Sequence, residues 1–313
     1  MTISSFATKL FTALAVLGLL SGCGDDSPVQ TVPSASCTRF DDYIRFLSTV
    51  DTPGSTRRAA RNGDVLYAAD GASGVQVVDI QDPSAPVVTS TIGMPEEATD
   101  VIVDNSHMYV ATNSGAIRIY DVSTPSAPVF EGVLGGAGQA LGLAIADTVL
   151  YVANDGVGLQ VISVSDPSSP RQIASENTPG EAQAVVVSGD YAYVSDAMLG
   201  LRVIFVADPT SPILVDTLTI PGQPRGIAIK EQTVYIASIT GGLQVIDVSN
   251  PLSPSIVRSV PMPGGVRDVD VQGDRAYAAD RSFGVHVLGL VDPNNPETVT
   301  SVSVPGEAIG VNT

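Results

Sequence analysis

The chain has little or nothing of several residue types from which common catalytic and metal sites are built. Its 313 residues include no tryptophan, two cysteines and two histidines. Two cysteines provide no disulfide framework, and His107 and His286 lack the spacing of zinc ligands. No glycine-rich phosphate loop or nucleophile elbow occurs either. The sequence therefore offers no catalytic residue, metal site or cofactor, and we expect a protein that is not an enzyme.

Basic residues are also scarce, with 15 lysines and arginines against 33 acidic residues and a net charge of −18. Such a surface repels a phosphate backbone, so we expect no nucleic-acid partner. Aromatic residues make up only 5% of the chain, so the core must be built mainly from Val, Ile, Leu and Ala.

What the chain has instead is a regular repeat with a period of 42 residues. Tyrosine and proline both recur at this spacing, and each of these prolines is followed by a second proline three residues later. The recurring residues are Tyr67, Tyr109, Tyr151, Tyr193, Tyr235 and Tyr277, and Pro83, Pro125, Pro167, Pro209, Pro251 and Pro293. A fixed period of this length indicates a repeat architecture in which each unit packs on its neighbours.

One period contains four strand-like runs. In the copy from Pro179 to Pro212 they begin with residues 182–187, 191–195 and 201–206, and residues 213–219 form the fourth. Helical periodicity is absent from residue 23 onward. Four short antiparallel strands per 42 residues predict an all-β fold, a β-propeller with one four-stranded blade per repeat. The tyrosines then pack between blades rather than bind a ligand.

Two further recurring positions have a conformational explanation. Asp-Pro-x-x-Pro must lie outside the strands, because proline cannot donate to a sheet ladder, and we expect it to connect the third strand to the fourth. A glycine recurs before the third strand, at Gly74, Gly158, Gly200, Gly242 and Gly284, where it supplies a turn conformation. Ala116 departs from this pattern beside Gly115, which predicts a turn shifted by one residue.

The third run and its exit carry a family resemblance. Residues 243–251 (LQVIDVSNP) and 75–80 (VQVVDI) resemble the LVIVD repeat of secreted or surface proteins of bacteria and archaea. The resemblance covers about residues 44–313 and implies a propeller and an extracytoplasmic location. It supplies no catalytic residues. Ser163, Phe205 and Gly289 replace the motif's aspartate, so the resemblance does not imply an acidic ring.

Six blades fit the six complete repeats, but both ends of the repeat region overrun. Residues 44–49 resemble a fourth strand ahead of the first repeat, and residues 305–311 repeat a turn and the start of a first strand. The first repeat has arginines near its inner strand, where an unpaired charge is costly. We therefore expect residues 308–311 to complete the first blade and residues 44–49 to pair at an outer edge. A seventh blade built from both termini is the alternative.

The first 22 residues read as a secretory signal peptide, with Lys9 ahead of an apolar run at residues 10–20. The run ends in Leu20-Ser21-Gly22-Cys23, which resembles a bacterial lipobox and implies lipidation of Cys23. Residues 23–43 are rich in polar residues and proline and predict a flexible tether, followed by the propeller at 44–313. We expect a monomeric propeller anchored to the cell envelope, at the outer membrane or cell surface rather than the inner membrane.

A binding site is expected where the loops ahead of the inner strands surround the central funnel. Charged residues there are Arg57, Arg58, Asp100, Arg225, Arg267 and Asp268. The pattern favours arginines that pair with neighbouring aspartates on a solvated rim. The alternative is a local anion site for a carboxylate or a sugar acid, formed by several arginines around one opening. Another set closes the second strand: Asp70, Thr112, Asn154, Asp196, Ser238 and Asp280. These are typical turn formers, with calcium ligation as the alternative.

These observations favour a non-enzymatic module that binds a protein or glycan at the cell envelope. The alternatives are a carbohydrate-active hydrolase or lyase that uses acids in the funnel, and a scaffold subunit of an envelope complex. The hydrolase requires convergent carboxylates such as Asp100 and Asp268, and the scaffold requires an apolar patch on the outer strands.

Overall fold

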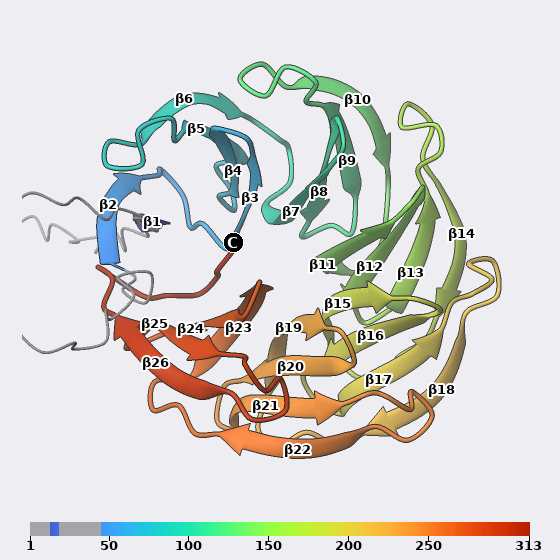
Figure 1. The fold of residues 1–313 in the computed structure, drawn as a ribbon. Helices are drawn as coiled ribbons and strands as arrows, with labels where there is room; N and C mark the ends of the chain where they lie inside the picture. The colour runs from blue at the N-terminus through green and yellow to red at the C-terminus, as the bar shows by residue number, and fades with distance from the viewer. Residues whose placement is uncertain (1–12, 19–44) are drawn as a thin grey trace, which may run out of the picture.

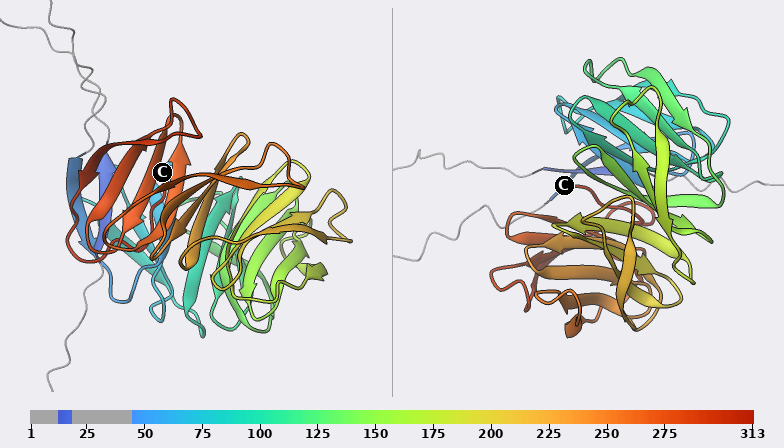
Figure 2. Two further views of the ribbon diagram at one scale, coloured as in Figure 1. Left: turned by 90° about the horizontal axis from the view of Figure 1, so that it is seen from below. Right: turned by 90° about the vertical axis from the view of Figure 1, so that its right-hand side faces the viewer.

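The computed structural model describes residues 13–18 and 45–313, and every element in these ranges is a β-strand. Twenty-four of the strands form six four-stranded antiparallel sheets arranged around a central axis, as Figures 1 and 2 show. The chain is therefore an all-β, six-bladed propeller, as the repeat predicts.

Each blade uses one repeat, and its strands lie in sequence order from the axis outward. Blades one to three comprise β3 (Arg58–Asn62), β4 (Val65–Ala69), β5 (Val75–Asp79) and β6 (Val87–Ile92); β7 (Ala98–Asp104), β8 (His107–Thr112), β9 (Ile117–Asp121) and β10 (Val129–Leu134); and β11 (Gln139–Ala146), β12 (Val149–Asp155), β13 (Gly158–Ser163) and β14 (Arg171–Glu176). Blades four to six comprise β15 (Ala182–Ser188), β16 (Tyr191–Asp196), β17 (Gly200–Phe205) and β18 (Ile213–Leu218); β19 (Pro224–Lys230), β20 (Thr233–Ser238), β21 (Gly242–Asp247) and β22 (Ser255–Val260); and β23 (Val266–Gln272), β24 (Arg275–Asp280), β25 (Gly284–Gly289) and β26 (Glu297–Val302). The four strands predicted for the fourth repeat match β15 to β18 to within one residue at each end.

The core lies between neighbouring blades rather than within one centre. The second and third strands are buried on both faces, and the outermost strands are largely exposed. Each of the six repeated tyrosines is at most 5% exposed. The hydroxyls of Tyr67 and Tyr235 donate to the carbonyls of Pro125 and Pro293, each the first proline of the connector in the next blade. The prediction that these tyrosines pack between blades is confirmed.

The repeated glycines take the conformation that the sequence indicates. Gly200 has a φ of +98°, and a Cβ there would lie 2.1 Å from the carbonyl oxygen of Leu218. A side chain at this position is therefore excluded twice, by the left-handed backbone and by the neighbouring strand. In blade two the positive φ of +77° belongs to Gly115 and not to Ala116, so the predicted one-residue shift is confirmed.

The Asp-Pro-x-x-Pro segments connect the third strand of each blade to the fourth, also as predicted. The side chain of Asp208 accepts from the backbone N–H of Thr210 at 2.9 Å, and Asp82, Asp166, Asn250 and Asp292 make the same contact in their blades. These short side-chain turns stiffen the exit from the third strand.

The ends of the repeat region meet between blade six and blade one. There β2 (Arg45–Asp51) lies at the outside of the ring and pairs with β1 (Ala13–Gly18), and the C-terminal segment runs inward to the axis (Figure 1). The backbone N–H of Val311 donates to Asp268 of blade six, while Gly310 lies against the carbonyl of Arg57 ahead of blade one.

This arrangement corrects the expectation that residues 308–311 complete the first blade. Blade one has its own inner strand, β3, which tolerates arginine because Arg58 pairs with Asp268 of blade six. The C-terminal segment instead separates the inner strands of blades six and one. Of the proposed leader, residues 13–18 form β1; its other residues, Cys23 and the proposed tether lie outside the described residues.

Candidate functional site at the central channel

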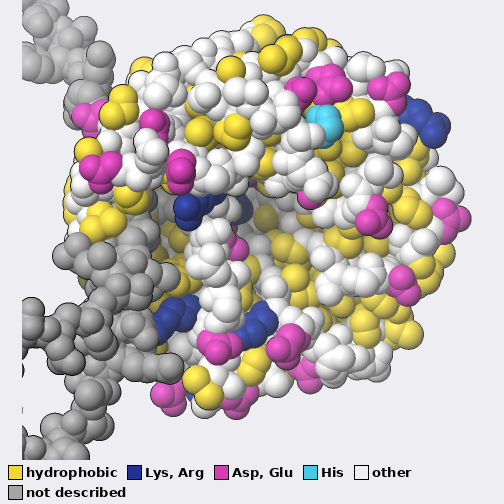
Figure 3. Space-filling model, turned by 45° about the horizontal axis from the view of Figure 1, so that its top comes forward, with side chains coloured by type: hydrophobic (Ala, Val, Ile, Leu, Met, Phe, Trp, Pro, Cys, Tyr) yellow, Lys and Arg dark blue, Asp and Glu magenta, His cyan; other side chains and the backbone are white. Residues whose placement is uncertain are grey.

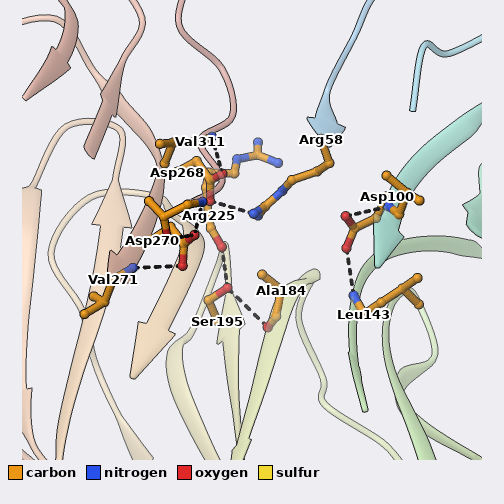
Figure 4. Close-up of polar contacts among 12 residues, drawn as sticks. Arg58, Asp100, Leu143, Ala184, Ser195, Arg225, Asp268, Asp270, Val271 and Val311 are labelled. Atoms are coloured by element: carbon orange, nitrogen blue, oxygen red, sulfur yellow. Dashed lines mark hydrogen bonds and ion pairs between the residues drawn. The ribbon is translucent and has the colours of Figure 1, made fainter. Parts of the chain in front are cut away.

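One position of each inner strand brings its residue to the axis of the propeller. The six residues at this position are Arg58, Asp100, Gly142, Ala184, Gly226 and Asp268, at the 42-residue period. Three of them are small, and the layer is tight: a Cβ on Gly142 would lie 2.6 Å from the Cα of Ala184. The three charged residues therefore share the remaining space, which Figure 4 shows between β3, β7 and β23.

Arg58 pairs across this space with Asp268, with 2.8 Å between Nη1 and Oδ1. The Asp268 side chain is 1% exposed, and its other oxygen accepts the N–H of Val311 at 2.9 Å. On the other side, Asp100 accepts the backbone N–H groups of Val101 and Leu143 at 2.8 and 2.9 Å (Figure 4). Asp100 thereby links the inner strands of blades two and three, and Asp268 links blade six to the C-terminal segment.

Burial controls the protonation of this group. It raises the pKa of Asp100 to about 6, although the charge of Arg58 and the two N–H donors oppose the shift. Burial raises the pKa of Asp268 in the same way. Burial alone would lower the pKa of Arg58, but the charges of Asp268, Asp100 and Asp270 outweigh it and the pKa lies above its usual value. The group therefore holds a fixed positive charge between two carboxylates.

One residue earlier in the chain, a second set surrounds the opening of the channel. The first strands of blades two to six each carry a β-bulge at this point, which leaves the residue without a cross-strand partner. Arg225 and Arg267 occupy the bulge positions of blades five and six, and Arg57 directly precedes β3, which pairs with β4 in a regular register. We call Arg57, Arg225 and Arg267 the channel-mouth arginines. In Figure 3 basic side chains gather around the hollow at the centre of this face.

The channel-mouth arginines are only partly compensated. Arg225 donates to the side-chain oxygen of Gln183, which stands at the same position in blade four. The Nε atoms of Arg225 and Arg267 are buried and have no hydrogen-bond partner among the described residues. Burial lowers the pKa of Arg267, and the positive charges of Arg281, Arg225 and Arg57 lower it further, with Glu307 acting in the opposite direction. This site is therefore locally positive in an acidic protein.

The six residues proposed from the sequence thus fall into two layers. Arg58, Asp100 and Asp268 form the inner layer, in which both acids are buried and Arg58 is partly exposed, and Arg57, Arg225 and Arg267 lie above it at the channel mouth. Sequence reasoning missed Arg281 and Glu307 as neighbours of the arginines, and Val311 as a partner of Asp268. For Val311 a signal existed, because it lies one period of 42 residues after Val269 of β23.

The residues that close each second strand are fully buried and not arranged around a common point. Asp70 accepts the hydroxyls of Thr52 and Thr56 and the N–H of Gly54, and Asp280 accepts the N–H of Gly264 and lies 3.2 Å from His286. The contacts with Thr52, Gly54, Thr56 and Gly264 fasten the loop ahead of the first strand. The predicted contacts with nearby backbone also form, because Asp196 accepts the N–H groups of Met198 and Leu199 and Asp280 accepts that of Ser282. Among the described residues, no group of three or more His, Cys, Asp or Glu side chains is placed to hold a metal ion. The described part also contains no helix long and apolar enough to cross a membrane.

Solved structures similar to this one share the fold at low sequence identity. One is the structure of U3-55K, with 13% identity, a TM-score of 0.67 and coverage of 83% of this chain and 85% of that one. Another is the computationally designed protein Ika8, with 12% identity, a TM-score of 0.60 and coverage of 82% of this chain and 76% of that one. A third is a functionally unknown protein from Desulfotomaculum acetoxidans DSM 771, with 13% identity, a TM-score of 0.64 and coverage of 76% of this chain and 80% of that one. At such identities the likeness concerns the fold alone. No curated protein matches the chain.

The family assignment comes from the repeats themselves. The model of the LVIVD repeat matches six times, at residues 53–92, 95–134, 137–178, 179–219, 221–261 and 263–304. Each match spans one blade, including the third strand whose residues carry the motif. The chain therefore belongs to the LVIVD repeat family.

Proposed function

We propose that this protein is a non-enzymatic binding module of the cell envelope that recognises an anionic partner at the channel-mouth arginines. The partner bears carboxylates, as an acidic glycan or an acidic protein segment does. The observation that carries the proposal is that the Nε atoms of Arg225 and Arg267 are buried and have no hydrogen-bond partner in the part of the chain that the structure describes. A buried guanidinium N–H without an acceptor is costly, and a bound carboxylate would supply the acceptor.

The electrostatics support the same conclusion. In a chain of net charge −18, the arginines at this opening lie close enough together that Arg57, Arg225 and Arg281 lower the pKa of Arg267. Like charges held together destabilise the empty site, so an anion gains more there than at an isolated surface arginine. The acidic remainder of the surface repels the same anion, which restricts binding to this opening.

Binding is favoured over hydrolysis by the contacts of the two acids. A hydrolase needs one carboxyl group to reach the substrate and a second to act on the opposite face of the scissile bond. Asp268 is engaged by Arg58 and Val311, and Asp100 by two backbone N–H groups, and both are at most 5% exposed. These contacts give both acids a structural role. We therefore propose binding and not a hydrolase or lyase activity.

The location is proposed from the sequence. Lys9, the apolar run and the Leu-Ser-Gly-Cys segment support removal of residues 1–22 and lipidation of Cys23, and the polar residues 23–43 then separate the propeller from the membrane. The absence of aspartate after Cys23 favours the outer membrane or cell surface. We propose a monomeric propeller there.

The ligand proposal is tested by titrating the protein with oligogalacturonate, with neutral oligosaccharides of similar length as the matched probe. We expect the acidic oligomer alone to bind, and its affinity to fall with added salt. Arg225→Ala and Arg267→Ala should each weaken binding about tenfold or more, since charge-assisted contacts contribute roughly 1.5–3 kcal/mol. Arg258→Ala on the exposed outer strand β22 is the control and should change nothing. Equal binding of both oligosaccharides, or full affinity in Arg225→Ala, would refute the site.

The location is tested separately in cells. Incorporation of labelled palmitate should be lost in Cys23→Ser. Protease treatment of intact cells, followed by mass spectrometry, should release propeller peptides such as those around Arg202 if the domain faces outward. Peptides released only after the outer membrane is broken would place the domain in the periplasm.

A further inference from the structure

The space between blades six and one is an incomplete seventh blade. Val311 lies 42 residues after Val269 of β23, and its N–H contacts Asp268 as the N–H of Leu143 contacts Asp100 in the neighbouring blade. The C-terminal segment therefore stands where the first strand of another blade belongs. At the outside, β2 precedes β6 by one period, so it stands where the fourth strand belongs. No strand in the described residues takes the second position.

The third position is taken by β1, and the backbone pairing shows this in detail. In blade five, Leu243 pairs with Val260, Gln244 with Ser259 and Ile246 with Ile256, with a register shift between Val245 and Ile246. Leu14 pairs with Val50, Ala15 with Thr49 and Leu17 with Phe46, with the shift between Val16 and Leu17. Val50, Thr49 and Phe46 are five periods before Val260, Ser259 and Ile256. β1 thus pairs with β2 in the same register, and with the same bulge, as a native third strand.

The sequence of β1 fits the position as well. Its Leu-Ala-Val-Leu at residues 14–17 aligns with Leu-Gln-Val-Ile at 243–246, so aliphatic residues stand at the first, third and fourth places of both. The position therefore accepts a proline-free aliphatic strand that runs antiparallel to β2. Such a strand adds its backbone hydrogen bonds to an open sheet edge, and its alternate side chains provide the specificity.

Among the described side chains, the face of blade six that meets this space packs against fewer buried apolar residues of a neighbouring element than the corresponding face of blade four does. Between blades four and five, the buried cluster includes Ile227, Val234, Ile236, Ile246 and Val248 from the later blade. Around Tyr277, among the side chains that the structure describes, Ala308 is the buried member from beyond blade six, with Phe46, Val304 and Val311 partly buried. No described strand at the second position covers this face, and removal of the leader would also take away the strand at the third.

We propose that, once the leader has been removed, the third position of this seventh blade binds an extended aliphatic β-strand of a partner protein. This inference rests on the leader removal in the proposed function, since that step takes β1 away from β2. The remaining N-terminal residues are poor substitutes. Between Asp26 and Arg39 they carry Pro28 and Pro33, and proline cannot donate to a ladder. β2 then presents an open edge beside an undercovered apolar face, which natural sheets avoid unless it is paired.

The test uses a soluble stand-in for the partner strand, a fluorescent peptide of residues 240–250 that includes the third strand of blade five. The protein is produced with its leader in a bacterial host, the processed form is purified from membranes, and its N-terminal mass is measured. The unprocessed full chain, purified from cytoplasm, is the matched control because β1 is covalently present. We expect one peptide per processed chain, a Tm raised by several degrees, and at least tenfold weaker binding to the full chain. A peptide with Val245→Pro should not bind.

Register is tested by disulfide formation in a Cys37→Ser background. A peptide with Gln244→Cys should cross-link to Thr49→Cys, because Gln244 pairs with Ser259 in blade five and Thr49 is its counterpart. It should not cross-link to Ser48→Cys, whose side chain points to the opposite face.

The outcomes separate the two proposals. No binding to a chain whose mass shows that residues 1–22 are gone overturns the strand site and leaves the lipid anchor intact. Retention of residues 1–22 in the membrane-purified protein overturns both, because the position is then never vacated. Cross-linking to Ser48→Cys in preference to Thr49→Cys overturns the assignment of the third position.

Discussion

Nη1 of Arg58 lies 2.8 Å from Oδ1 of Asp268, and this ion pair joins the inner strand of blade one to that of blade six across the C-terminal segment. All other neighbouring blades pack inner strand against inner strand. At this junction a charged contact replaces that apolar packing, and an arginine that looks unfavourable in sequence becomes part of the closure of the ring.

Removing either partner of this pair should destabilise the fold. Arg58→Met leaves Asp268 buried with an uncompensated charge, and we expect it to lower the free energy of unfolding by about 3–5 kcal/mol, measured by chemical denaturation. Asp268→Leu should cost less, because the Arg58 side chain is 26% exposed and keeps Asp100 and Asp270 nearby. Arg61→Ala, at an exposed position of the same strand, is the control and should cost less than about 1 kcal/mol.

The double variant Arg58→Met/Asp268→Leu should recover much of that loss, since neither charge then remains unpaired. Additive losses in the double variant would show that the ion pair is not the interaction lost in the single ones.

Asp100 should make stability depend on pH in the direction opposite to an ordinary surface carboxylate. Its pKa of about 6 in the folded state exceeds the usual value of 3.8, so between these limits the folded protein binds a proton that the unfolded chain does not. Stability then rises as pH falls from 6 to 4, by at most about 3 kcal/mol for this group. The difference in unfolding free energy between wild type and Asp100→Asn, measured across this range, isolates the effect. A difference that is constant with pH would contradict it.

The tyrosine hydroxyls provide a further prediction. Tyr235 is fully buried and donates to the carbonyl of Pro293 at 2.8 Å, so Tyr235→Phe removes one hydrogen bond between blades and leaves the ring packing in place. We expect a loss of about 0.5–1.5 kcal/mol in unfolding free energy. Tyr235→Ala also removes the ring and should cost about 3–5 kcal/mol. Similar losses in the two variants would mean that the hydroxyl, and not the ring, dominates the contribution.

The strands, the turns and the packing residues were predictable because they depend on local sequence patterns, and each pattern occurs in six copies of the repeat. Gly115 takes the left-handed turn conformation in place of Ala116, which one copy alone would not have indicated. Arg58, Asp100 and Asp268 were identified as funnel residues from the sequence, but the pairing within this inner layer was not predictable in this way. Asp268 and Arg58 are far apart in the sequence and come into contact only when the ring closes. No local sequence pattern indicates a contact between the first and the last blade.

The ends were harder for a related reason. Residues 13–18 are aliphatic, and the same composition suits the core of a leader and the third strand of a blade. Periodicity alone did indicate that residues 44–49 resemble a fourth strand and that 305–311 begin a first one. The sequence left the assignment of both ends to one additional position in the ring as the alternative, because the choice depends on how far apart blades six and one lie.

The C-terminal segment should therefore contribute to stability out of proportion to its length. Its Ala308 is the buried apolar contact that the Tyr277 cluster receives from beyond blade six, and its Val311 N–H satisfies an oxygen of Asp268. Deleting residues 304–313 removes both and should lower the Tm by many degrees. Val311→Pro removes the donor but keeps Ala308 in place, and should cost about 1–3 kcal/mol, chiefly because a buried carboxylate oxygen loses its partner. Thr313→Ala, at the exposed end beside Asp270, is the control and should change the Tm little. An unchanged melting curve after the deletion would mean that blades six and one hold the ring closed by themselves, through Arg58 and Asp268.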